Sequence, residues 1–288
     1  MSEKIESLSA IQMLRAFRAH SKLGWDLEGN WAPAWLYVIF ALIPPIFGVL
    51  MLVFMYRIVM GDNGSPDYLA FLLAGSASFL FVRLLLAGAG MVVVEDREHY
   101  KTFRYIYTSP IPFPVQIFGR VAPKTLIAIF GAVLTIWAGH AVLKVTLNPA
   151  GIDWLTVVAS LALAIIGMAS IGWMLASLML VIDRMGWIIA EGIAGLLFLI
   201  TGAIFPMSLL PAPVAAIGKS IPITYWMDLW RLAIFGKAAK LGTTFTVDKL
   251  WLYLVLTTIL WAIIAIVWYR IADKLARHWG KIEQETFY

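Results

Sequence analysis

Long apolar stretches with few charges are the feature that most constrains what this chain can fold into. Six occur in its 288 residues, at 34–58, 68–94, 117–143, 154–182, 186–205 and 249–270. A helix of about 20 apolar residues crosses the hydrocarbon core of a bilayer. The strands of a membrane barrel alternate in character and run for only about ten residues. The sequence therefore predicts an all-α integral membrane protein with six transmembrane helices.

The composition supports this class of protein and excludes others. Hydrophobic residues make up 61% of the chain and charged residues 14%, with a mean hydropathy of +0.86. Ordinary soluble domains are about a quarter charged. The chain has no cysteine, and its four histidines, at positions 20, 99, 140 and 278, are far apart. We therefore expect no disulfide, and no metal or cofactor bound by this chain. The net charge of +5 reflects basic residues beside apolar stretches, not nucleic-acid binding.

The chain is expected to comprise a cytoplasmic N-terminal segment (1–33), one six-span transmembrane domain (34–272) and a cytoplasmic C-terminal tail (273–288). In the first segment, apolar and basic residues separate onto two helical faces: Ile11, Leu14 and Phe17 against Arg15, Arg18 and Lys22. This separation predicts an interfacial helix that lies in the headgroup region of the membrane. An ordinary solvated helix is the alternative.

The positions of Lys and Arg predict the orientation. Of the 22 such residues, fourteen fall on the side that carries the N-terminus, seven fall on the other side, and Arg83 lies within a span. Cytoplasmic loops carry the excess of Lys and Arg. We therefore expect a multi-pass protein of the cell membrane with both termini in the cytoplasm.

The predicted outer segment, residues 206–248, is unusual for a loop. Its first part, PMSLLPAPVAAIGKSIPITYWMDLWRLAIFG, contains four prolines yet is mostly apolar. Proline breaks helices, and broken backbone at membrane depth must be covered by protein. We therefore predict proline-broken re-entrant helices before the last span, with an amphipathic surface loop as the alternative. The stretch PVAAIGKS ends like a phosphate-binding loop but lacks the first glycine and a preceding strand, so we do not interpret it as one.

The densest charge cluster lies between the second and third predicted spans, in the stretch VVVEDREHYKTFRYIYTSPIPF (residues 92–113). Residues 95–116 form the largest predicted cytoplasmic loop between spans. Four aromatic residues are interleaved with the charges: Tyr100, Phe103, Tyr105 and Tyr107. Aromatic residues and arginine dominate the energetics of protein interfaces. The pattern predicts a docking surface for a soluble partner. A solvated connector whose basic residues only enforce orientation is the alternative.

This loop resembles that of ABC type-2 permeases, the membrane subunits of a large class of ATP-driven exporters. Their loop runs as an acidic–basic–acidic cluster, then Gly-Thr, then a proline eight residues after the threonine, often preceded by Thr or Ser. The corresponding residues here are the cluster Glu95, Asp96, Arg97 and Glu98, then Thr102, Ser109 and Pro110. Lys101 replaces the glycine.

A second match lies in the outer segment. Residues 220–236 are similar to the family's Asn-Pro-x-Thr-Tyr segment, which is followed by an Arg and a Gly before the last span. The match is carried by Pro222, Thr224, Tyr225, Arg231 and Gly236, and Ser220-Ile221 departs from the usual preceding Asn. Six spans and a proline-broken segment extend the likeness over nearly the whole chain.

The resemblance implies a permease subunit that is not itself an enzyme. Two permeases, identical or different, would pair, and each would rest on a separate cytosolic ATPase that binds ATP and Mg. The complex would export a hydrophobic or amphipathic substrate, such as a drug, lipid or polysaccharide. The implied ATPase-coupling loop comprises Glu95, Asp96, Arg97, Glu98, Lys101, Thr102, Arg104, Tyr105, Ser109 and Pro110. The implied outer re-entrant segment contains Pro206, Pro222, Thr224, Tyr225 and Arg231.

Two charges fall inside predicted spans, Arg83 near the middle of the second and Glu191 in the fifth. A charge at the bilayer centre costs at least about 2.5 kcal/mol. Arg83 is therefore expected to face protein or water, with a structural role or a role in the translocation path. As titrating groups, Arg83 or Glu191 would instead suit an ion-coupled secondary transporter, although the internal repeat common in such carriers is not visible. The lack of clustered His, Asp or Glu within spans disfavours an intramembrane enzyme.

The predicted topology can be tested by labelling. Single cysteines placed at Gly64 and at Gln284, in a chain without cysteine of its own, should react with a membrane-impermeant maleimide from opposite sides of sealed vesicles. Labelling of both positions from the same side would contradict the predicted six-span topology.

Overall fold

The computed structural model of the chain describes residues 9–29, 33–60, 65–143, 145, 148–182, 186–236 and 245–280. All regular secondary structure in this part is helical. The α-helices are α1 (Ala10–Gly29), α2 (Ala34–Met60), α3 (Pro66–Phe81), α4 (Gly88–Val94), α5 (Phe103–Tyr107), α6 (Phe113–Leu143), α7 (Trp154–Met179), α8 (Gly186–Ile200), α9 (Ala212–Lys219), α10 (Pro222–Phe235) and α11 (Val247–His278). The shorter elements are the π-helical turns η2 (Val82–Ala87) and η3 (Glu95–His99) and the 3-10 turns η4 (Pro149–Gly151) and η5 (Met207–Leu209).

Among the described residues, four helical segments are long and apolar enough to cross a bilayer: Asp67–His99, Phe113–Ala141, Trp154–Met179 and Val247–His278. Two further apolar stretches, Ile46–Ile58 within α2 and all of α8, are shorter. The 15 residues of α8 reach about 22 Å, against a hydrocarbon core of about 30 Å. The expected class, a helical multi-pass membrane protein, is therefore confirmed, while the count of six spans stays a prediction.

The outward faces of the long helices are apolar. Val255, Ile259 and Ile263 are exposed along α11, and α6 exposes Phe130 and Trp137. Soluble proteins rarely expose contiguous apolar surface on this scale. Lipid is the solvent that suits these faces.

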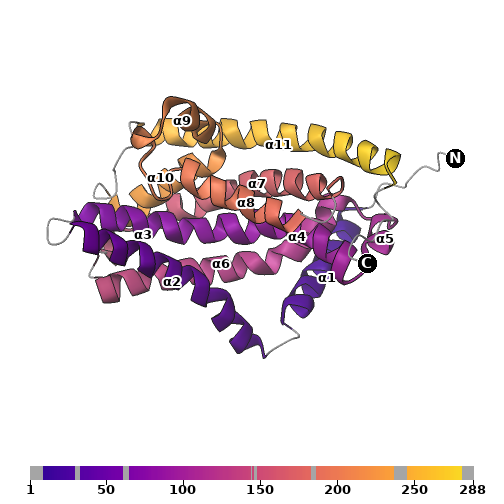
Figure 1. Cartoon of the computed structure of the whole chain (residues 1–288), viewed down its shortest axis with the longest axis horizontal. Coiled ribbons are helices and arrows are strands. Elements are labelled where there is room, and N and C mark those ends of the chain that lie inside the picture. The colour runs from indigo at the N-terminus through magenta and orange to yellow at the C-terminus, as the bar shows by residue number, and fades with distance from the viewer. Residues whose placement is uncertain are drawn as a thin grey trace.

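A central helix runs without a break from Pro66 to His99, through α3, η2, α4 and η3. Helices α6, α7, α8 and α10 all pack against it. Its side chains are accordingly buried almost throughout, with Phe71, Phe81 and Leu86 among the most enclosed. Figure 1 shows α3 and α4 in the middle of the bundle, with α11 along the upper edge and α2 and α6 below.

The two ends of the bundle carry different elements. Helices α1 and α5 gather with the C-terminal ends of α4 and α11 at one end, at right in Figure 1. Helix α9 lies toward the other end (Figure 1). The charged stretch and the proline-rich segment therefore lie toward opposite ends of the bundle.

Local chemistry sets several helix boundaries. Pro66 and Pro222 stand in the first turns of α3 and α10, where the missing N–H of proline costs no hydrogen bond. The Asp153 carboxylate caps α7 by accepting from the N–H of Thr156 at 3.1 Å. Helix α10 ends at Gly236, whose φ of +63° favours glycine.

Helix α1 occupies the position predicted for the N-terminal helix. It packs on the start of α6, so closely that a Cβ on Gly24 would collide with the carbonyl group of Arg120. Ile11 and Leu14 remain exposed, which leaves an apolar surface on α1. Its depth in the headgroup region stays a prediction.

The proline-rich segment consists of short helices. After η5, α9 and α10 are separated only by Ser220 and Ile221. Gly218 and Lys219 belong to α9, so the stretch that ends like a phosphate-binding loop is helical. Helix α10 packs between α3, α7 and α11. Whether this segment re-enters the membrane stays a prediction. At the C-terminus, α11 continues to His278, into the predicted tail, and residues 281–288 lie outside the described part.

Candidate functional site

The charged stretch folds into a compact elbow, residues 95–112, which comprises the last turn of the central helix (η3), the following turn and α5, and which leads into α6. The chain turns at Lys101, whose φ of +53° lies in the left-handed region. The N–H of Thr102 closes the turn by donating to the carbonyl oxygen of Asp96 at 2.9 Å. An L-residue is strained in this conformation and glycine is not. Lys101 stands where the resembled family has glycine.

Arg97 faces the interior of the bundle and holds the end of α7. Its Nη1 donates to the carbonyl oxygen of Met179 at 3.0 Å, and its Nη2 to that of Ile182 at 2.8 Å. A helix leaves its last carbonyl groups without partners inside the helix. The neighbouring Glu98 accepts from Nε at 2.7 Å, and its side chain is only 7% exposed. Arg97 therefore supplies hydrogen-bond donors to carbonyl groups at the end of α7, and the adjacent Glu98 carboxylate balances its charge.

Arg120, on α6, binds the other two carboxylates of the cluster. It forms a buried ion pair with Asp96, and its Nη2 lies 3.3 Å from Oε2 of Glu95. Its guanidinium also lies 5.9 Å from the centre of the Tyr100 ring. His20 of α1 is close by, and burial, with a further effect of the Arg120 charge, lowers the pKa of that imidazole. His20 is therefore neutral at pH 7, which adds no second positive charge beside Arg120.

Gln116, in the first turns of α6, fixes the exit of the elbow. Its Nε2 donates to the carbonyl oxygens of Ile106 at 3.2 Å and Ile111 at 2.7 Å, and to Oγ of Ser109 at 2.9 Å. One buried amide thus holds three points of the returning chain.

Tyr107 joins α5 to the C-terminal part of α11. Its hydroxyl donates to Oδ1 of Asp273. Nε of Arg277 donates to the same hydroxyl oxygen and to Oδ2 of Asp273, both at 3.1 Å. Burial and the adjacent Asp273 carboxylate raise the pKa of Tyr107. The phenol therefore keeps the proton that it donates to Asp273.

The opposite side of the elbow faces outward. Tyr105 is 76% exposed, whereas Phe103 beneath it is 5% exposed. The other exposed residues of this face are Lys101, Thr102, Arg104, Thr108 and Pro110. The elbow thus has one face attached to the bundle and one that offers two cations, Lys101 and Arg104, and the ring of Tyr105.

The residues predicted for the coupling loop therefore divide into two groups. The acidic–basic–acidic cluster contacts the protein's own helices, and Ser109 is bound by Gln116. The outward group is Lys101, Thr102, Arg104, Tyr105 and Pro110. Sequence reasoning assigned no role in the elbow to Gln116, Arg120, Asp273 or Arg277. Their only signal was that each is a polar residue near the end of an apolar span.

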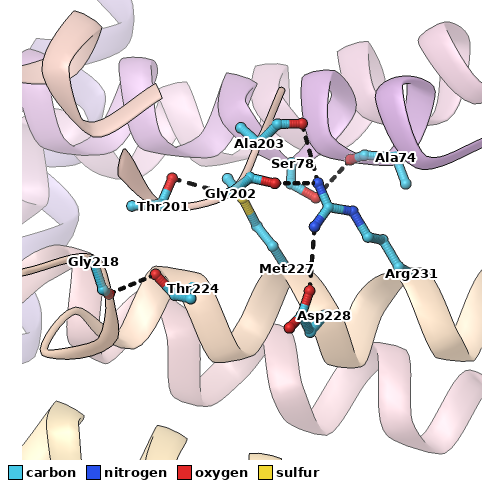
Figure 2. Close-up of polar contacts among 10 residues, drawn as sticks. All are labelled: Ala74, Ser78, Thr201, Gly202, Ala203, Gly218, Thr224, Met227, Asp228 and Arg231. Atoms are coloured by element: carbon cyan, nitrogen blue, oxygen red, sulfur yellow. Dashed lines mark hydrogen bonds and ion pairs between the residues drawn. The ribbon is translucent and has the colours of Figure 1, made fainter. Parts of the chain in front are cut away.

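Arg231, in the outer segment, is the second buried arginine that holds a helix end. Its Nη2 donates to the carbonyl oxygens of Gly202 at 2.7 Å and Ala203 at 3.0 Å, just past the end of α8 (Figure 2). Its Nη1 lies 3.2 Å from Oδ1 of Asp228 (Figure 2). The guanidinium also lies 3.7 Å from the centre of the Phe71 ring. Arg231 therefore joins α10 to α3 and to the turn after α8.

The Pro-x-Thr-Tyr motif has a similar structural role. Thr224 donates from Oγ1 to the carbonyl oxygen of Gly218 at 2.7 Å (Figure 2), and the Tyr225 hydroxyl donates to that of Lys219, also at 2.7 Å. Together they satisfy the last carbonyl groups of α9. Pro222 begins α10, and Pro206 is buried before η5. These residues hold two short helices together.

The structure also brings Arg83 and Glu191 together. Nε of Arg83 lies 3.5 Å from Oε2 of Glu191, and the two side chains are 48% and 46% exposed. Arg83 belongs to the π-helical turn η2, and Glu191 to α8. This pair lies between two apolar helical segments of the bundle.

The described part of the chain contains no group of three or more His, Asp or Glu side chains that could hold a metal ion. The fold and these contacts define an all-helical membrane protein with a polar elbow attached at one end of its bundle. No protein-family model matches the chain, and no curated protein is significantly similar to it.

Lys101→Gly should stabilise the protein, because glycine adopts the left-handed conformation without steric strain. The strain costs about 1–2 kcal/mol, and the flexibility of glycine in the unfolded chain offsets part of the gain. We expect the free energy of unfolding to rise by about 0.5–1 kcal/mol, seen as a higher thermal midpoint in detergent. Lys101→Ala removes the same charge but keeps the strain. A midpoint for Lys101→Gly below that of Lys101→Ala would contradict the strained turn.

Arg231→Met should be strongly destabilising. It leaves two buried carbonyl groups without their donor and Asp228 without its counter-ion, a change that costs about 3–5 kcal/mol. The thermal midpoint and the folded yield in detergent measure this loss. Arg104→Met, on the exposed face of α5, is the matched control and should change stability by less than about 0.5 kcal/mol. Equal losses in both variants would contradict the structural role of Arg231.

Proposed function

We propose that this chain is the permease subunit of a type-2 ABC exporter, with the elbow as the element that receives movement from a cytosolic ATPase. The observation that carries the proposal is the two-sided construction of the elbow. One side of α5 is exposed, and the other side is attached to several helices of the bundle. An element that transmits force between two proteins needs both sides.

The attachments reach four parts of the bundle. Arg97 links the elbow to α7, Arg120 and Gln116 link it to α6, and Tyr107 links it to α11. The fourth link is the unbroken backbone of the central helix. Breaking a buried ion pair by removing one partner costs about 3–5 kcal/mol. A push on α5 would therefore displace these helices before it detached the elbow.

The exposed side supports a soluble partner with an acidic groove. Lys101 and Arg104 would direct the approach and register of such a partner, because complementary charge favours correct encounter. The ring of Tyr105 would supply the buried apolar contact that dominates interface energetics. ATP and Mg would bind to that partner, and the permease itself would carry out no chemistry.

The complete assembly in this proposal has two permeases and two ATPases in the cell membrane. Six spans, with both termini of each permease in the cytoplasm, place the elbow on the same side as the ATPase. The apolar surface and its half-buried charges suit a hydrophobic or amphipathic substrate, such as a drug, lipid or polysaccharide, moved outward.

An ion-coupled secondary transporter is the competing function, and Glu191 is the observation that favours it. A carboxylate in the apolar part of a bundle is a natural proton carrier. Here, however, the Arg83 guanidinium lies 3.5 Å away, so the carboxylate is held in an ion pair. Transport in sealed vesicles distinguishes the two: vanadate should stop an ABC exporter, and a protonophore should stop the carrier.

Arg104→Glu combined with Tyr105→Ala should release the ATPase without unfolding the permease. These side chains are exposed, so the thermal midpoint should change little. We expect at least about tenfold less vanadate-sensitive ATPase activity to co-purify with the tagged permease from its native membranes.

Lys249→Glu provides the control, because it reverses an exposed charge at the start of α11, far along that helix from Asp273 and Arg277. This variant should retain the full ATPase activity. If no vanadate-sensitive ATPase accompanies the wild-type permease, or if the double variant retains it, the proposed coupling role is wrong.

A further inference from the structure

The central helix is buried along most of its length, but a charged side chain is exposed near its middle. In the segment Asp67–His99, all of which the structure describes, Arg83 is the only exposed residue apart from the two end residues. Arg83 is also the midpoint of this 33-residue segment, sixteen residues from either end. If the segment crosses the bilayer symmetrically, the guanidinium lies at the bilayer centre. A charge at that depth faces protein or water, not lipid chains.

The backbone at Arg83 also departs from a regular α-helix. Arg83 lies in η2, where the N–H of Gly88 donates to the carbonyl oxygen of Arg83, five residues earlier. Single π-helical turns inside α-helices are rare and are frequent at functional sites. The turn sets Arg83 opposite Glu191 on α8, at 3.5 Å.

The ion pair alone does not satisfy all the polar atoms of Arg83 and Glu191. About half of each side chain is exposed, 48% for Arg83 and 46% for Glu191. Among the described residues, no third charged group joins the pair. An ion pair in an apolar medium is stable only when further polar contacts satisfy both partners. Something outside this chain must supply them.

The surface of α8 beside the pair is open. A Cβ on Gly192 or Gly195 would meet no atom within 4 Å, whereas Gly90 and Gly172 in the bundle are in close contact with neighbouring helices. The same face of α8 exposes Trp187, Ile188, Leu196 and Leu199. Glycines let another helix approach closely in a membrane. Together with the exposed ion pair, they leave room for a protein helix.

We infer that a second copy of this chain covers this face, so that the Arg83–Glu191 pairs of the two copies meet across a two-fold axis. A two-fold interface brings the same patch of both subunits together. A patch with one positive and one negative group is complementary to itself, because Arg83 of each copy can lie opposite Glu191 of the other. The resulting four-charge cluster satisfies both pairs. The inference rests on the proposed function, which requires two permeases, and it assigns the surface through which they pair.

Disulfide cross-linking tests the inference directly, because the chain has no cysteine of its own. Gly192→Cys and Gly195→Cys place thiols where the structure leaves open space. Ile263→Cys, on the exposed face of α11, is the control for random collision in the membrane. In native membranes treated with copper phenanthroline, we expect covalent dimers from at least one α8 variant, at about ten times the control yield or more.

A charge-exchange experiment tests the role of the ion pair. Arg83→Glu places two negative groups together in one chain, and Glu191→Arg places two positive groups together. Each variant alone should lose dimer, whereas the two co-expressed with different tags should form a mixed dimer, at least about tenfold above either homodimer. Mixed and single-variant dimers in equal amounts would overturn the inference. If either variant fails to fold, the cysteine variants alone decide.

The outcomes separate this inference from the proposed function. If the vanadate-sensitive ATPase co-purifies with the cysteine variants but α8 cross-links no more than α11, the interface is wrong and the exporter stands. Cross-linking through α8 without any co-purifying ATPase supports the α8 interface and contradicts the proposed exporter function. A chain that is monomeric in native membranes overturns both.

Discussion

A backbone carbonyl group at a buried helix end must find its donor within the protein, and the rest of this structure depends on how that need is met. Buried arginines supply the donors at two helix ends. Arg97 binds the carbonyl groups at the end of α7, and Arg231 binds those just past α8. Each arginine brings a charge into a medium of low dielectric constant, so each has a carboxylate beside it, Glu98 and Asp228. Broken helices are tolerated here because these charges are balanced locally.

The same requirement is met by different contacts at the two ends of the bundle. At the end that carries α5, ion pairs and charged hydrogen bonds connect the elbow to α6, α7 and α11, so that its position is coupled to theirs. In the proline-rich segment, hydroxyl groups of Thr224 and Tyr225 and the buried Arg231 hold short helices against the central helix. A partner that moved the elbow would act on long helices, whereas the short helices would respond through their contacts with the central helix.

Hydropathy predicted the long helices closely, because the transfer of a side chain into lipid depends mainly on that side chain. The stretches 154–182 and 249–270 correspond to α7 and α11, and 186–205 to the shorter α8. The proline-rich segment was correctly expected to be broken rather than one spanning helix. The direction in which the charged cluster points was not predictable. Asp96 and Arg97 face inward only because α6 and α7, distant in sequence, present Arg120 and the carbonyl group of Met179 to them.

The sequence by itself determined that this is a helical membrane protein, that its charges concentrate in one loop, and that two charges lie within apolar helices, since composition and spacing are properties of the chain alone. Only the tertiary structure decided which of those charges hold helix ends, which remain exposed on α5, and that Arg83 meets Glu191. These are contacts between segments far apart in the sequence, and their partners are set by how the helices pack, which no local pattern of residues encodes.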